Sequence, residues 1–129
     1  MAVVKVPKKR FTEFKRAVKY WIEIFGLKHW EVYIDFGGVD EDAYAEVEYD
    51  VQTKTATIRL TDTCKDRQEL NELQPDKRAF HEVCHLMLAT LNEMADSKIR
   101  IGKNEVSLEI HNVIRILENA IYEYYEGHQ

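Results

Sequence analysis

The chain has 129 residues, of which 45% are hydrophobic and 32% are charged, and this is the size and balance of one globular domain. The composition excludes a disordered, collagen-like or low-complexity chain. A net charge of −5 argues against binding of nucleic acid through bulk electrostatics, and no apolar run approaches the ~20 residues of a membrane-spanning helix. We therefore predict a single domain over residues 1–129, with neither a membrane nor a nucleic-acid partner.

The cysteines and the first ten residues bear on the compartment. Cys64 and Cys84 are too few for a disulfide framework, and this favours a reduced environment, with a bridge between the two as the alternative. The basic residues within positions 1–10 are not followed by an apolar stretch, so we expect no secretory signal. These features predict a cytoplasmic protein.

Helical and strand periodicities follow one another in the first half of the chain. Apolar residues spaced by three and four predict a helix from about Lys8 to Phe25, with Gly26 as its left-handed cap. A period of two then predicts three strands, over residues 30–36, 43–49 and 55–60. The short polar link 50–54 predicts a hairpin, so we expect a small, mostly antiparallel three-stranded sheet.

The second half of the chain reads as helices. A short helix is expected over 65–73, capped by Asp62, and a longer one from Pro75 to about Met94. A polar and basic loop, 96–103, precedes a last helix that would start at an Asn104 cap and run to about Glu126. The order of a helix, strands and then further helices predicts an α+β fold.

One segment carries a pattern with chemical meaning, the H-E-x-x-H match His81-Glu82-Val83-Cys84-His85. On a helix, positions i and i+4 lie about 40° apart, so both imidazoles project from one side and can bind one zinc ion. Glu82 projects about 100° from His81, a position suited to a base that acts on a metal-bound water. The pattern predicts a zinc site, and the alternative is an ordinary helix surface without a metal.

A catalytic zinc site needs a third protein ligand and an open fourth position. The candidates on the last helix are Glu105, Glu109, His111 and Glu118, and helix geometry alone does not choose among them. Cys84 falls within the apolar stripe of its own helix, so we predict a small buried side chain rather than a ligand. His29 and His128 are expected to be incidental. Tyr49, Tyr122, Tyr124 or Tyr125 could stabilise an oxyanion, although packing is the simpler role for each.

Several segments together resemble the small zinc metallopeptidase-like proteins of bacteriophages and prophages, which are minimal members of the zincin group. The segment Leu27–Val32 is similar to their entry into the first strand, and residues 49–50 with 54–60 resemble their hairpin. Phe80–Leu86 matches their motif helix, and His111–Glu118 resembles their closing helix. The resemblance covers most of the chain and implies a zincin-like fold, but only the H-E-x-x-H motif is specific.

The resemblance also implies roles for residues. In this family the third ligand is a glutamate on the helix after the motif helix, and that position falls on His111 here. A site of His81, His85 and His111 is implied, with Glu109 as the close second. An edge strand near the motif helix, where an extended peptide could be added, is implied as well.

These observations lead to two readings of the function. The first is a zinc-dependent hydrolase, a metallopeptidase acting on a peptide or protein, in which Zn²⁺ is held by His81, His85 and His111 and Glu82 activates the bound water. Such a protein would work in the cytoplasm, which is the host's if the gene belongs to a phage. The second is a non-catalytic zincin-like module that holds zinc or recognises a protein partner. The sequence gives no cleavage preference and no oligomeric state.

Overall fold

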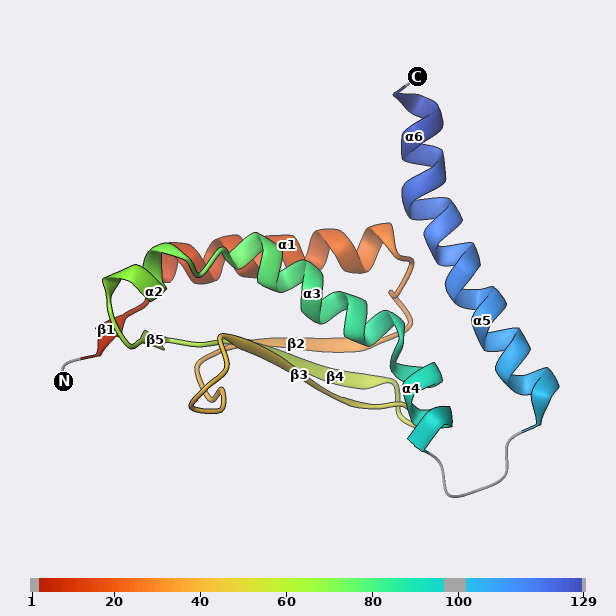
Figure 1. Cartoon of the computed structure of the whole chain (residues 1–129), viewed down its shortest axis with the longest axis horizontal. Helices are drawn as coiled ribbons and strands as arrows, with labels where there is room; N and C mark the ends of the chain where they lie inside the picture. Colours follow the sequence, from red (N-terminus) through yellow and green to blue (C-terminus); the bar gives the residue numbers. More distant parts are fainter. Residues whose placement is uncertain (1–2, 97–101, 129) are drawn as a thin grey trace.

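Two helices lie side by side over one face of a three-stranded sheet, and a long helical arm leaves this layer near the C-terminus (Figure 1). The computed structural model describes residues 3–96 and 102–128. The predicted α+β class is confirmed.

The first helix, α1 (Lys8–Ile24), confirms the prediction from the apolar periodicity. Phe14 and Val18 are fully buried on the face that this periodicity marks. Gly26 has a φ of 67°, so the predicted left-handed cap is confirmed as well. The cap turns the chain toward the sheet.

The sheet consists of β2 (Glu31–Phe36), β3 (Ala45–Asp50) and β4 (Thr55–Leu60) in the order β2-β4-β3. The hairpin between β3 and β4 is confirmed as an antiparallel pair, but β2 pairs with β4 in parallel. The prediction of a mostly antiparallel sheet is therefore wrong for one of its two pairings. Alternation indicates which face of a strand is buried, but it does not identify the neighbouring strand.

Two very short strands, β1 (Val4–Lys5) and β5 (Thr63–Cys64), pair with each other and were not predicted, because two residues are too few to show a period. Gly37 leads out of β2 with a φ of 95°, and a Cβ there would lie 2.9 Å from Oδ2 of Asp62. The turn therefore requires glycine, both for its backbone conformation and for space.

The predicted helices of the middle segment are confirmed with changes at their ends. The helix α2 (Arg67–Asn71) is capped by Asp66, which accepts a hydrogen bond from the Glu69 backbone N–H at 2.9 Å, and not by Asp62. The helix α3 (Pro75–Met87) starts at Pro75 as expected. It ends at Leu88 and is followed by α4 (Ala89–Asp96), so the predicted single helix is two. A local break of this kind leaves the apolar spacing almost unchanged.

The C-terminal arm consists of α5 (Lys103–Leu117), a π-helical turn η1 (Glu118–Tyr122) and α6 (Glu123–Gly127). Gly102 occupies the N-cap position, so the predicted cap at Asn104 is wrong by two residues. The predicted loop 96–103 falls largely on residues 97–101, outside the described residues. Val113, Ile116 and Ala120 pack against the core, and much of the remaining arm points into solvent.

The core lies between α1, α3 and the sheet. Its fully buried large side chains come from α1, β4, α3 and the link between α2 and α3: Phe14, Val18, Ile58, Leu60, Leu73, Val83 and Leu86. Trp21 of α1 packs against Phe80 of α3 with 4.7 Å between ring centroids. This packing leaves one side of α3 uncovered, next to β3. Among the residues that the structure describes, no helix is both long enough and apolar enough to span a membrane.

Candidate metal centre

The uncovered side of α3 presents His81 and His85, one helical turn apart. Their Nε2 atoms lie 3.2 Å apart, and their rings meet edge to face with 4.9 Å between centroids. Both side chains are exposed, while the opposite side of the same helix is anchored by the buried residues Val83 and Leu86. The amphipathic pattern of α3 therefore fixes the direction in which the two imidazoles point.

The spacing of the two nitrogens can be compared with that required by zinc. Two imidazole ligands on a tetrahedral zinc ion, each with a Zn–N distance of about 2.0–2.1 Å, have nitrogens about 3.3 Å apart. The observed 3.2 Å separation is close to this value. The same contact is also compatible with a hydrogen bond between one protonated and one unprotonated nitrogen. The pair thus supplies two donors of the right kind at the right separation.

Glu82 lies beside this pair and is buried, with 7% of its surface exposed. Burial raises the pKa of its carboxyl group above the ordinary value, and nearby Glu46 raises that pKa further. His81, His85 and Arg78 oppose this change, because positive charge favours the carboxylate. A carboxyl group whose pKa is raised above its ordinary value is better suited to accept and then release a proton.

The structure does not bring the predicted third ligand to the pair. Within residues 3–96 and 102–128 there is no group of three or more His, Cys, Asp or Glu side chains that could hold one ion together. His111 is exposed, and its Nδ1 makes a 2.8 Å hydrogen bond with the Ser107 carbonyl of its own helix. Glu105 and Glu118 are exposed too.

Glu109 differs from the other candidates on α5. It is half-buried and lines a cavity of about 610 Å³ between α5 and the main layer. Leu86 and Met87 from the end of α3 line the same cavity, together with Trp30 and Lys54. Among the four candidates, only Glu109 lines this cavity, and it does so on the Leu86 side of α3 rather than beside His81 and His85.

The cysteines do not join the site. Cys64 and Cys84 are both free thiols, so the alternative of a bridge between them is excluded in this structure. Burial raises the pKa of both thiols, which favours their protonated form in the metal-free protein. Cys64 is buried as part of the core, and Cys84 is half-buried beside the core.

The remaining candidates lie away from the histidine pair or have other contacts. The Tyr49 hydroxyl accepts a 2.8 Å hydrogen bond from the Asn92 side chain, and the Tyr122 hydroxyl donates one of 2.7 Å to Glu126. Tyr124 stacks on His128 with 3.9 Å between ring centroids. His29 lines the cavity next to α5, and the side chain of Tyr125 lies outside the described residues. None of these contacts identifies an oxyanion donor.

The sequence analysis missed two residues beside the motif, Arg78 and Tyr44. Arg78 precedes His81 by three residues and Glu82 by four, so it lies on the same side of α3. Its guanidinium carbon lies 4.5 Å from the ring centroid of Tyr44, and its Nε donates to the Leu73 carbonyl at 3.1 Å. The position of Arg78, a cation one turn before the motif, could have identified it from the sequence. Its contact with Tyr44 depends on tertiary packing and could not.

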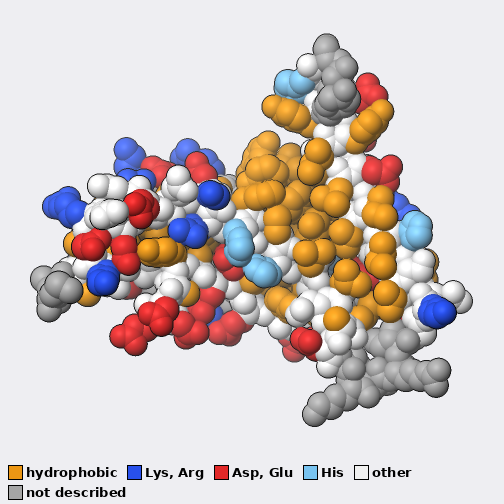
Figure 2. Space-filling view, viewed as in Figure 1, with side chains coloured by type: hydrophobic (Ala, Val, Ile, Leu, Met, Phe, Trp, Pro, Cys, Tyr) orange, Lys and Arg blue, Asp and Glu red, His pale blue; other side chains and the backbone are white. Residues whose placement is uncertain are grey.

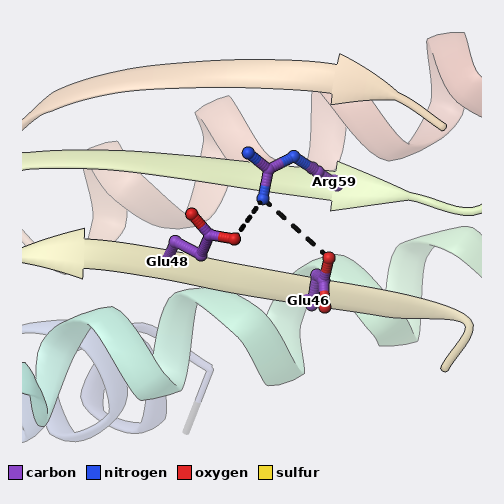
Figure 3. A network of polar contacts seen from close by, with 3 residues as sticks. All are labelled: Glu46, Glu48 and Arg59. Atoms are coloured by element: carbon purple, nitrogen blue, oxygen red, sulfur yellow. Dashed lines mark ion pairs between the residues drawn. The ribbon is translucent and has the colours of Figure 1, made fainter. Parts of the chain in front are cut away.

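The strand next to α3 is β3, which lies at an edge of the sheet. Its outward-facing Glu46 and Glu48 both approach Arg59 of the central strand (Figure 3). The Arg59 Nη1 atom lies 3.0 Å from Glu48 Oε1 and 3.9 Å from Glu46 Oε1, as ion pairs without hydrogen-bond geometry. The network places fixed charge on the edge strand, close to Glu82.

Comparisons with models of protein families, with curated proteins and with solved structures find no match to this chain.

Proposed function

We propose that the chain is a zinc-dependent hydrolase of the metallopeptidase kind with a zincin-like fold. The observation that carries the proposal is the 3.2 Å separation of the His81 and His85 Nε2 atoms, which suits two ligands of one tetrahedral ion. Bound zinc would lower the pKa of a coordinated water to about 7 and polarise a substrate carbonyl.

Glu82 is the general base of this proposal. Its burial beside the histidines and the raised pKa of its carboxyl group support this role. The carboxylate would take a proton from the attacking water and then pass it to the nitrogen of the leaving amine. Because the carboxyl group is shielded from solvent, the transferred proton would stay within the site until the peptide bond has broken.

The substrate in this proposal is a peptide in extended conformation. The strand β3 offers a free edge beside α3, where backbone hydrogen bonds could hold such a peptide next to the histidines. The arrangement of α1 and α3 over a small sheet with this edge strand is also what supports the zincin-like assignment.

The third ligand is proposed to come from α5. The resemblance assigns it to His111, whereas the cavity between α5 and α3 is lined by Glu109. Histidine and glutamate are both common zinc ligands in proteins. We therefore test both by substitution.

A non-catalytic module is the second candidate. It is favoured by the missing third ligand within the described residues and by the exposed apolar side chains of α5. Both candidates are compatible with the cytoplasm, since the free thiols of Cys64 and Cys84 suit a reducing compartment.

The first experiment combines metal analysis with a hydrolysis assay. Protein purified without chelators is analysed for zinc, and hydrolysis of an unfolded protein is followed for the parent and for Glu82→Gln. The proposal predicts about one zinc per chain in both proteins, and a loss of activity of about 100-fold or more in Glu82→Gln. Glu93→Gln, an exposed glutamate on α4, is the matched control and should keep full activity.

The outcomes separate the candidates. Zinc in the parent without any hydrolysis would favour the non-catalytic module. A parent that neither carries zinc nor takes it up on addition would overturn the metal site and both zinc-dependent readings. Equal activity in Glu82→Gln and the parent would exclude Glu82 as the base.

A further inference from the structure

The C-terminal arm carries a row of large apolar side chains that are substantially exposed. Five of them form the outer stripe, which we define as Ile110, Ile114, Leu117, Ile121 and Tyr124. Their exposed fractions are 42%, 46%, 37%, 56% and 64%. Figure 2 shows hydrophobic side chains gathered along this arm. Isolated exposed apolar residues are common, but a continuous stripe marks a binding surface.

The spacing of the outer stripe is specific. Its members follow each other at intervals of four, three, four and three residues, which is the heptad pattern of a helix that pairs with another helix, and Ile121 lies within the π-helical turn η1. Val113, Ile116 and Ala120 of the same arm already pack on the chain's own core, so the stripe faces elsewhere. Ile114, Leu117 and Ile121, with two neighbours, also line a shallow depression of about 410 Å³, into which a side chain of a facing helix could fit.

We infer that the outer stripe is the contact surface between two copies of this chain, which pair through antiparallel C-terminal arms. The stripe is centred on Leu117, so a two-fold axis near this residue would bring each half of the stripe against the other half in the second copy. Such a contact is satisfied by the chain itself and needs no complementary surface from a different protein.

The area of the stripe supports a second copy as the occupant. The exposed parts of its five side chains amount to roughly 500 Å². Two stripes with their flanking residues would then bury about 1,000 Å² or slightly more, at the lower end of specific interfaces. We therefore expect a reversible dimer with a dissociation constant on the order of micromolar.

The charge of the arm argues against a lipid surface and bears on the orientation of the two copies. From residue 103 to 127 the arm carries five glutamates against Lys103 and Arg115. An acidic helix is repelled by anionic lipid surfaces, so a membrane is a poor occupant. Antiparallel pairing about Leu117 sets Glu123 of one copy level with His111 of the other and sets no glutamate level with another glutamate, whereas parallel pairing would align like charges.

Sedimentation equilibrium of the full chain, from about 1 µM to about 1 mM, tests the inference. The parent should pass from monomer to dimer over this range, and Ile114→Glu should weaken the association by about tenfold or more. Leu108→Glu is the matched control, because Leu108 is 67% exposed on the same helix but outside the stripe, and it should associate as the parent does. Circular dichroism checks that both variants keep their helix content.

Cross-linking provides a second readout. Leu117→Cys should form a covalent dimer on mild copper-catalysed air oxidation, because the residue would meet its own copy near the axis, while Leu108→Cys should not. A monomer at every concentration would overturn the inference, as would a dimer that Ile114→Glu leaves unchanged. Binding to neutral phosphatidylcholine vesicles by a chain that stays monomeric would overturn it in favour of a lipid surface.

Discussion

Glu109 and His111 lie two residues apart on α5 and point to different sides of it, Glu109 into the cavity shared with α3 and His111 into solvent. Successive residues of a helix turn by about 100°, so these two side chains cannot both face the histidine pair. The choice between them decides how α5 would complete the site.

We expect Glu109→Ala to lower zinc affinity by about 100-fold or more, because losing a ligand should cost at least as much as losing a residue that only hydrogen-bonds to a ligand. His111→Ala should leave the affinity within about threefold of the parent if the side of α5 seen here is the one that faces the metal. Titration against a zinc chelator of known affinity measures both. The reverse result would show that α5 turns about its axis when the metal binds.

Zinc should stabilise the fold through the histidine pair. At a free concentration 100 times the dissociation constant, binding adds about 2.7 kcal/mol to the free energy of unfolding. His81→Ala and His85→Ala should each abolish most of this gain, whereas His128→Ala should keep it, because His128 stacks on Tyr124 at the far end of the arm. Urea unfolding with and without zinc measures the difference. An equal gain in all four proteins would place the zinc elsewhere.

In the absence of metal, Glu82→Gln should make the protein more stable near neutral pH, by on the order of 1 kcal/mol. Burial raises the pKa of Glu82 in the folded state, so its stabilising contribution belongs to the protonated form. That contribution is fully present below the unfolded pKa of about 4.5 and is lost as pH rises through the raised folded pKa. The variant should therefore gain little at acidic pH and most at neutral pH, as urea unfolding in chelator at several pH values would show.

Loss of the Glu48 carboxylate should lower the free energy of unfolding less than loss of the Arg59 guanidinium. The Glu48 side chain is 71% exposed, so Glu48→Gln should change the free energy of unfolding by less than about 0.5 kcal/mol. Arg59→Met should cost about 1–3 kcal/mol, because it leaves the partly buried Glu46 without its ion-pair partner near Glu82. Thermal unfolding of the two variants, compared at matched pH, tests the order. A larger loss in Glu48→Gln would contradict it.

Much of the local structure was predictable because it depends on neighbours in the chain. The three–four spacing before Gly26 predicted α1, and the period of two predicted β2, β3 and β4 to within about two residues. The parallel pairing of β2 with β4 was not predictable, because the alternation of apolar and polar residues does not show which strands lie next to each other in the sheet. The break at Leu88 and the N-cap at Gly102 were missed because both are decided by local backbone geometry that the apolar spacing does not record.

The sequence by itself determined that His81 and His85 share one side of a helix with Glu82 next to them, because helix periodicity fixes these directions. Only the tertiary structure decided that Glu82 is buried, that Arg78 meets Tyr44 beside β3, and that Glu109 rather than His111 lines the cavity at the end of α3. These relationships join segments far apart in the chain. They depend on how helices and strands pack, and local patterns contain no measure of that packing.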